Sequence, residues 1–171
     1  MKKINIVLII VIVAVVAAIV ARGYFLYNRL SISQKQTASI IYKNDKYGFQ
    51  ITLPIKWASY TIVEQTWDGH EIDNYQKIYT GPELLIKNPT LATENKFQGI
   101  PVMVFTPGQW SLVSGNNPTV AVSAAPIGPG KIGENLKYIF ATPPRYIGFA
   151  DDLSLEQYNE VQNIVKTFKG F

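Results

Sequence analysis

The 171-residue sequence contains no cysteine and only one histidine. Without cysteine the chain can form no disulfide framework, hold no iron–sulfur cluster, and use no catalytic thiol or lipid-modified cysteine. A single histidine argues against a metal site built from several histidines. Charged residues are also scarce, at 16% of the chain against about 25% in an average globular protein, while 47% of the residues are hydrophobic. This composition excludes a disordered chain, a collagen-like chain and a coiled coil.

Positive charge is concentrated at the N-terminal end of the chain. The net charge is +4, and the first 30 residues contain no acidic residue. The basic residues of this segment are Lys2, Lys3, Arg22 and Arg29. From Ser31 onward 12 basic residues are matched by 12 acidic ones, so the body of the protein is neutral. Nucleic-acid binding requires a basic patch on the folded domain, and we therefore expect no nucleic-acid partner.

An uncharged run of 18 residues, Ile4–Ala21, follows the first basic pair. As a helix it would span about 27 Å, which nearly matches the ~30 Å hydrocarbon core of a bilayer. A cleaved signal peptide is the alternative, and it has an apolar stretch of about 7–15 residues before a small-residue cleavage site. Because this run is longer and its cleavage site is poor, the sequence predicts an uncleaved transmembrane signal-anchor helix over residues 1–27.

The flanking charges predict the orientation of this anchor. Lys2, Lys3 and the amino terminus favour a cytoplasmic N-terminus, although two arginines on the other flank oppose it. A long C-terminal domain is translocated largely regardless of its charge. We therefore expect a single-pass protein of the cytoplasmic membrane with its N-terminus inside and its C-terminal domain outside. The polar composition of residues 28–37 predicts a short linker. Residues 38–171 are numerous enough to form one domain with its own core.

Several segments have the composition of β-strands. Residues 47–53 alternate apolar and polar side chains, residues 57–67 are rich in β-branched and aromatic residues, and residues 100–105 are continuously apolar. The continuous run is typical of a strand buried on both faces. Further short strands are predicted over residues 39–42, 120–124 and 137–142. Turns or loops are predicted at Asp68–Gly69 and over the Pro/Gly-rich residues 126–133.

The C-terminal helix is the clearest single element. Ser154 and Gln157 form a capping box at its start. An apolar stripe at helical spacing follows, and it consists of Leu155, Tyr158, Val161, Val165 and Phe168. Gly170 lies where such helices commonly stop. With a helical turn at residues 109–113, the pattern predicts an α+β fold in which an antiparallel β-sheet has helical cover and the anchor helix lies outside it.

One polar cluster invites a site hypothesis. It consists of Asp68, His70, Glu71 and Asp73. These side-chain types bind metals, but four such neighbours cannot easily face one ion, and we favour a solvated hairpin turn. No serine lies in a G-x-S-x-G elbow, and residues 128–131 fail the phosphate-loop pattern. Three tryptophans could line a ligand groove, although a place in the core is the simpler interpretation. We predict no catalytic residue, no metal and no cofactor.

The segment that contains Tyr42, Gly48–Phe49, Leu53–Pro54 and Trp57 resembles the opening of PsbP-like domains, in which these residue types mark the first hairpin. The ending, residues 164–169, resembles their closing helix. The resemblance implies an αβα arrangement with a central antiparallel sheet. PsbP-like proteins are typically extracytoplasmic assembly or interaction factors without a shared active site. A photosystem role is not implied, because nothing in the sequence indicates a thylakoid.

The middle of the chain resembles a group of membrane-anchored bacterial proteins to which no activity is attached. The resemblance is carried by residues 100–106, 109–110, 124–129 and 135–146. Within it, Arg145 beside Tyr146 could bind a carboxylate or a phosphate, although pairing of the arginine with an internal acid is the simpler interpretation.

These observations predict a membrane-anchored extracytoplasmic domain of the non-catalytic binding type, such as an envelope assembly factor. Its expected partners are the membrane and an envelope protein. The alternative is an anchored hydrolase that acts on an envelope polymer, with Asp68 or Glu71 in a cleft. A third hypothesis is that the domain oligomerises through a sheet edge. The candidate binding residues are Arg145, Tyr146, Trp110 and His70.

Overall fold

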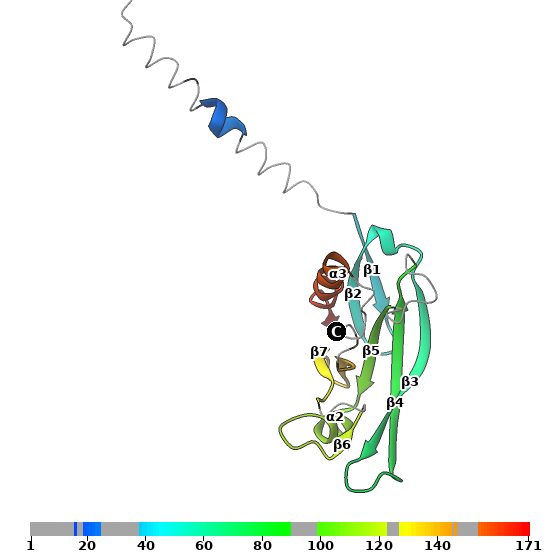
Figure 1. Cartoon of the computed structure of the whole chain (residues 1–171). Coiled ribbons are helices and arrows are strands. Elements are labelled where there is room, and N and C mark those ends of the chain that lie inside the picture. Colours follow the sequence, from blue (N-terminus) through cyan, green and yellow to red (C-terminus); the bar gives the residue numbers. More distant parts are fainter. Residues whose placement is uncertain are drawn as a thin grey trace, which may run out of the picture. The chain divides into compact units, whose positions relative to one another are not determined.

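The computed structural model describes residues 16, 19–24, 38–89, 99–122, 127–144, 146 and 154–171. The chain divides into two units, residues 1–37 and 38–171, and the strands lie in the second unit (Figure 1). Most of the predicted anchor, and all of the predicted linker over residues 28–37, lie outside the described residues. Within the described part of the chain, no helix combines the length and the apolar character that a membrane span requires.

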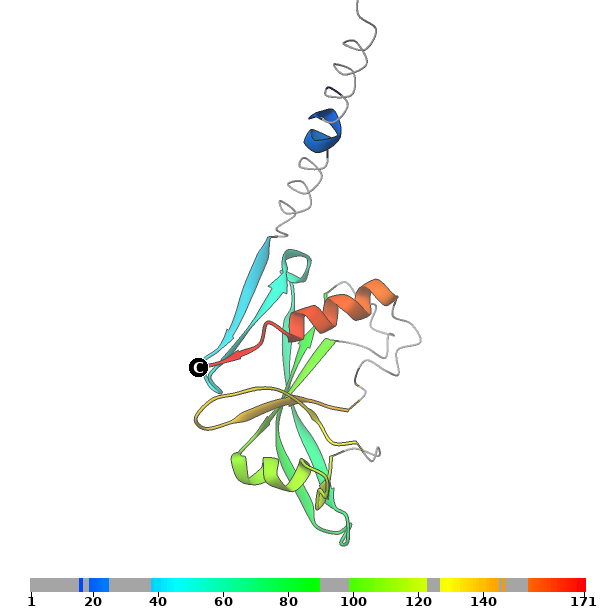
Figure 2. The same cartoon turned by 90° about the vertical axis from the view of Figure 1, so that its left-hand side faces the viewer.

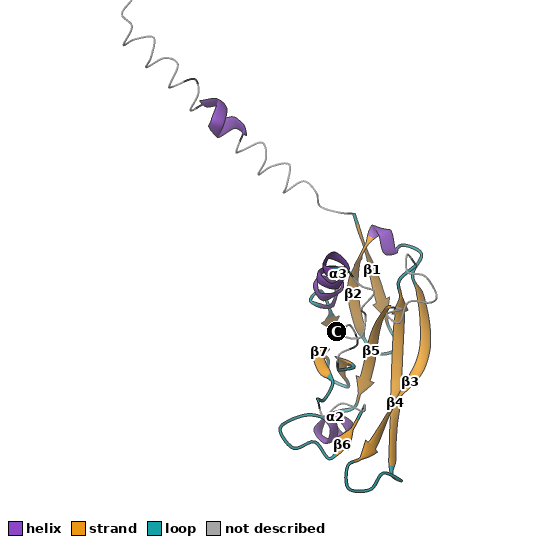
Figure 3. Ribbon diagram, viewed as in Figure 1, coloured by secondary structure: helices purple, strands orange, loops and turns teal. Residues whose placement is uncertain are grey.

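The second unit contains two β-sheets, and every pairing among the described strands is antiparallel (Figure 3). One sheet has the order β1-β2-β9, and the other has the order β6-β3-β4-β5-β8-β7. The strands are β1 (Ser39–Asn44), β2 (Phe49–Pro54), β3 (Thr61–Glu71), β4 (Ile78–Lys87), β5 (Gly99–Phe105), β6 (Val120–Ala121), β7 (Gly130–Glu134), β8 (Ile139–Thr142) and β9 (Lys169–Gly170). The helices are the 3₁₀ helix η1 (Ile55–Trp57), α2 (Pro107–Val113) and α3 (Leu155–Val165). The predicted α+β fold with antiparallel pairing is confirmed.

β5 lies inside the six-stranded sheet and is buried at all seven of its residues. Val102 and Val104 belong to one hydrophobic cluster, whereas Met103 and Phe105 belong to another. Since successive side chains of a strand point to opposite faces, the sheet buries a core on each face. The prediction that residues 100–105 form a strand covered on both sides is confirmed.

The larger core joins both sheets to α3. It contains Phe49, Phe140 and Phe168, whose ring centroids lie 5.0 to 5.2 Å from one another. The smaller core lies against α2, and in it Trp67 stacks on Phe105 at 4.5 Å between centroids. Figure 2 shows α3 and α2 towards different ends of the domain, with the β7–β8 hairpin between them. Each helix therefore covers its own core.

Several local predictions were wrong. Trp57 does not begin a strand but ends η1, where its fully buried indole donates a hydrogen bond from Nε1 to Glu160 Oε1 of α3 at 2.9 Å. Asp68–Gly69 form no turn, because the pairing of β3 with β4 continues through them. Residues 130–133 lie in β7 rather than in a loop. Of the strand predicted over residues 120–124, β6 covers Val120–Ala121, and residues 123–124 lie outside the described part. Gly170 does not terminate α3 but pairs with β2 as part of β9.

The start of α3 agrees with the capping box in detail. The Ser154 hydroxyl accepts a hydrogen bond from the Gln157 backbone N–H at 3.3 Å, and the Gln157 side chain accepts one from the Ser154 N–H at 2.9 Å. The predicted apolar stripe is wrong at both ends, because Leu155 and Tyr158 are exposed and Phe168 lies beyond α3, which ends at Val165. Burial begins at Val161, because only the later part of the helix lies over the larger core.

Candidate functional site

β3 and β4 are the longest of the described strands, and the hairpin that they form carries the predicted polar cluster at its end. The turn covers residues 72–77 and is closed by backbone hydrogen bonds from Glu71 N to Lys77 O at 3.1 Å and from Lys77 N to Asn74 O at 3.0 Å. The Asn74 side chain also accepts a bond from the Gln76 N–H at 3.3 Å, a local contact that favours asparagine in turns. The cluster thus spans the strand end and the turn.

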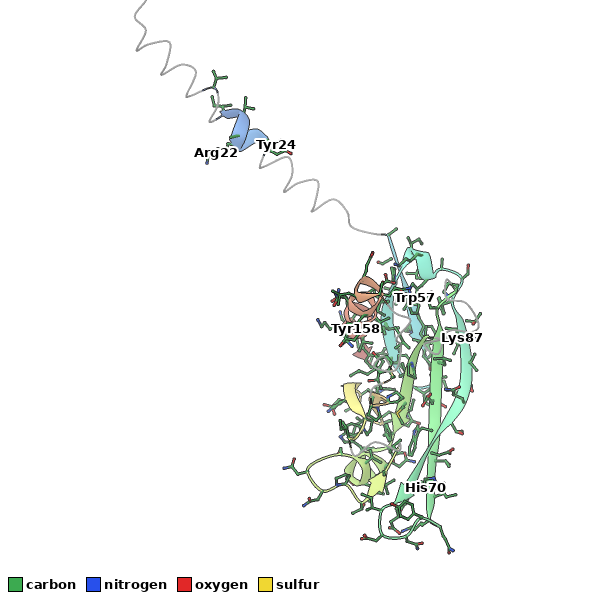
Figure 4. All side chains as sticks on the ribbon, in the orientation of Figure 1. Arg22, Tyr24, Trp57, His70, Lys87 and Tyr158 are labelled. Atoms are coloured by element: carbon green, nitrogen blue, oxygen red, sulfur yellow. The ribbon has the colours of Figure 1, made fainter. Side chains whose placement is uncertain are left out.

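Two polar side chains of this cluster, those of His70 and Glu71, contact their own hairpin. His70, labelled in Figure 4, has Nδ1 3.2 Å from the carbonyl oxygen of Tyr75, which is a hydrogen bond when Nδ1 carries the proton. Glu71 forms an ion pair with Lys77 at 3.1 Å, and the Lys77 ammonium lies 5.2 Å from the Tyr79 ring centroid. Hydrogen bonding with Tyr79 and Glu71 raises the pKa of Lys77. Among the described residues, no three histidine or carboxylate side chains are grouped to hold a metal ion.

The two carboxylates of the hydrolase hypothesis do not converge. Asp68 and Glu71 are three positions apart in the continuous strand β3, so their side chains leave opposite faces of the sheet. Glycoside hydrolysis needs two carboxyl groups that flank the same bond. The arrangement of Asp68 and Glu71 does not supply such a pair.

Three apolar side chains are exposed around the hairpin turn. Ile72, Tyr75 and Ile78 expose 41%, 75% and 58% of their surface. Apolar residues scattered singly over a surface are ordinary, but three within seven residues concentrate apolar area at one end of the domain. We call these three residues the hairpin-end surface. The Ile72 N–H donates to the Thr119 carbonyl at 2.9 Å, which ties this surface to the segment before β6.

Trp110 lies on α2, beside the hairpin. α2 starts with a capping box in which Gln109 is the third residue, and Gln109 Nε2 also donates to the Thr80 carbonyl of β4 at 3.1 Å. The half-buried ring of Trp110 packs edge-to-face on Phe105, with 5.5 Å between the centroids. The space between α2 and the hairpin has no room for a water molecule. Trp110 therefore contributes to packing between α2 and the smaller core.

Tyr146 lies against the larger core and not at the hairpin. Burial, and then the nearby Tyr158, raise the pKa of its phenol well above the usual range. Arg145 lies outside the described residues. Of the other three candidates, Tyr146 packs on the larger core, whereas Trp110 packs on the smaller core beside the hairpin that carries His70 at its end.

A shallow depression of about 420 Å³ lies where the β1–β2 turn approaches β3 and β4. Tyr47 and Glu64 are among the residues that line it. At its rim, the Lys46 ammonium lies 3.0 Å from Glu64 Oε2 and 5.1 Å from the Tyr47 ring centroid. Hydrogen bonding to Glu64, and then to Tyr47, raises the pKa of Lys46. The depression is open, and the Glu64 carboxylate is paired.

The hairpin-end surface was not among the predicted sites. The sequence does contain a signal for this surface. Turns are usually polar, but Ile72 and Tyr75 flank the polar pair Asp73–Asn74. No protein-family model, curated protein or solved structure gives a significant match to this chain.

Proposed function

We propose that this chain is a single-pass, membrane-anchored protein whose extracytoplasmic domain binds a protein partner through the hairpin-end surface. The observation that carries the proposal is the joint exposure of Ile72, Tyr75 and Ile78 at one turn. Covering apolar area of this kind with a partner stabilises the complex, and tyrosine is among the residues that most often dominate binding energy. The uncharged run of residues 4–21 and the basic pair before it support the anchor and its orientation.

The position of the turn within the domain supports this function. The Ile55 N–H donates to the Ala38 carbonyl at 2.8 Å, so the chain enters the domain beside η1, shortly before β3 begins. β3 then runs for 11 residues, or roughly 35 Å, to the turn. Figure 1 shows the start of β1 and the β3–β4 turn at opposite ends of the domain. The hairpin-end surface therefore lies at the end of the domain opposite to the start of β1.

We further propose that the domain is PsbP-like. The residues that carry the resemblance have structural roles in this chain: Gly48 adopts a φ of 74°, and Phe49 and Trp57 are fully buried. Residues of this kind support a shared fold rather than a shared active site. A PsbP-like fold is compatible with a binding function, because function is carried by the surface that each member presents.

Site-specific photo-crosslinking in cells that make the full chain tests the binding function. A photoreactive amino acid replaces Tyr75, and a matched variant carries it in place of Leu136, which is fully exposed in the β7–β8 turn. We expect one discrete crosslinked species from position 75 and none from position 136. Adding Ile78→Asp should remove that species while the amount of folded protein stays the same. Equal crosslinking from both positions, or none from position 75, would contradict the proposal.

A further inference from the structure

One long edge of the six-stranded sheet has no partner strand within the described part of the chain. β3 pairs with β4 from Thr61 onward, but on its other side β6 pairs only with His70 and Glu71. Among the described residues, Val63–Asp68 therefore have a neighbouring strand on one side only, and Figure 1 shows this part of β3 at the outer side of the sheet. An edge of this kind presents a row of backbone N–H and C=O groups to solvent.

The side chains of this edge are exposed as well. Val63–Thr66 are exposed at four consecutive positions, so accessible side chains lie on both faces of the strand. Val63 exposes 39% of its surface, and the Glu64 side chain exposes 66%. The central strand β5, by contrast, is buried throughout. An added strand could therefore contact both the backbone and the side chains of β3.

Several features that prevent strand pairing at natural edges are missing here. β3 contains no proline and no lysine, and its register with β4 is continuous, without a bulge. The charged residues of this edge are instead both acidic. Glu64 and Asp68 lie on the same face of the strand, with Thr66 between them. Lys46 pairs with Glu64 at an exposed site where a competing cation can replace it, and no described residue forms an ion pair with Asp68.

We infer that Val63–Asp68 is a strand-addition site for an extended, basic segment of a partner protein. In the added strand, the residues opposite Glu64 and Asp68 are four positions apart, and lysine or arginine there would form two cross-strand ion pairs. A β-branched residue between them would oppose Thr66. A second copy of this edge would instead place like charges against each other, which disfavours self-association. The inference concerns a surface other than the hairpin end and does not depend on the anchor.

Fluorescence anisotropy with the detergent-solubilised full chain tests the inference. The probe is the labelled peptide STKVTVKTS, which carries two lysines four positions apart. One control peptide, STEVTVETS, reverses the charges, and another, STKPTPKTS, keeps the charges but cannot pair as a strand. We expect saturable binding of the probe and of neither control. The E64K/D68K variant should bind the probe at least about tenfold more weakly, and it should gain binding of the glutamate peptide.

A matched variant, E134K/E156K, makes the same change in net charge on β7 and α3, and it should bind the probe as the native chain does. Circular dichroism and thermal unfolding establish that both variants are folded. Equal binding of the proline peptide would overturn strand addition, because attraction would then be electrostatic only. If E134K/E156K weakens binding of the probe as much as E64K/D68K does, the probe does not bind at Val63–Asp68 specifically, and the inference would be overturned. If the native chain sediments as a dimer and the E64K/D68K variant as a monomer, the edge binds a second copy of the chain. That result would overturn the inference.

Discussion

The side-chain nitrogen of Asn135 lies 2.8 Å from the carbonyl oxygen of Gly48, 87 residues earlier in the chain. The same nitrogen donates to the Tyr47 carbonyl at 2.9 Å. Asn135 Oδ1 accepts hydrogen bonds from the backbone N–H groups of Lys137 and Tyr138, both at 2.9 Å. One side chain thus closes the β7–β8 turn and fastens it to the β1–β2 turn, which joins the two sheets.

Asn135→Ala should destabilise the domain by about 1–3 kcal/mol, because it leaves part-buried backbone groups in two turns without their partner. Urea unfolding followed by circular dichroism measures the change. Asn116→Ala is the matched control, because Asn116 is exposed and its side chain forms no hydrogen bond with the described residues; it should change stability by less than about 0.5 kcal/mol. Equal effects of the two substitutions would show that Asn135 does not hold the sheets together.

Gly48 is required at its position for two reasons. Its φ of 74° is disfavoured for other residues, and an added Cβ would lie 2.7 Å from the Phe171 carbonyl oxygen and 2.8 Å from Asn135 Nδ2. Gly48→Ala should therefore cost about 1–3 kcal/mol of stability. Gly108→Ala, in α2 with nothing within 4 Å of the added carbon, should be neutral or stabilise by up to about 1 kcal/mol. Thermal unfolding compares the two, and a stable Gly48→Ala variant would refute this account of the turn.

Glu83 predicts a pH dependence of stability. Its carboxyl is buried in β4 and accepts a hydrogen bond from Gln65 Nε2 at 2.5 Å. Burial raises its pKa above the ordinary value of 4.5, and the bond from Gln65 opposes this rise without cancelling it. Between the unfolded and folded pKa values the folded state binds more protons than the unfolded state. Stability contributed by this group is therefore complete below pH 4.5 and is lost as pH rises through the folded pKa.

Glu83→Gln removes that loss and keeps an acceptor for Gln65. The variant should be more stable than the native chain at neutral pH, and the advantage should shrink as the pH falls towards 4.5. Urea unfolding at several pH values measures the difference. A difference that is constant with pH would mean that Glu83 does not titrate in this way.

Glu160 holds the indole of Trp57 in place and also pairs with Lys56. Glu160→Ala leaves a fully buried indole N–H without an acceptor and should cost about 1–3 kcal/mol of stability. Glu160→Gln keeps an acceptor and loses only the ion pair with an exposed lysine, so its cost should be about 1 kcal/mol or less. Equal costs in urea unfolding would assign the effect to the ion pair instead.

Features of the fold that depend on local physics could be predicted from the sequence. The capping box of α3 is local because Ser154 and Gln157 satisfy each other's backbone groups within one turn. The burial of β5 on both faces follows from its continuous apolar run. Features that depend on distant contacts could not be predicted. Asp68–Gly69 has the composition of a turn, but pairing with β4 outweighs that preference. Trp57 lies outside β3 and bonds to Glu160 of α3, more than 100 residues later in the chain.

The candidate site shows the same limit. Residue types at the hairpin end are visible in the sequence, but the exposure of Tyr75 and Ile78 depends on how far β3 and β4 extend beyond their neighbours. The open edge at Val63–Asp68 depends on which strands pair, and no local pattern determines that order. A two-residue strand such as β9 is too short to give a periodic signal.

The rate at which a membrane-impermeant maleimide labels single cysteines in intact cells tests the central claim most directly. The chain has no cysteine of its own, so Tyr75→Cys and Leu136→Cys each provide one reactive thiol. If the domain lies outside the membrane and a partner covers the hairpin end, position 136 will be labelled quickly in cells. Position 75 will be labelled slowly in cells and quickly in the purified protein. Labelling of both only after lysis would contradict the extracytoplasmic position, and equal rates in intact cells would contradict binding at the hairpin end.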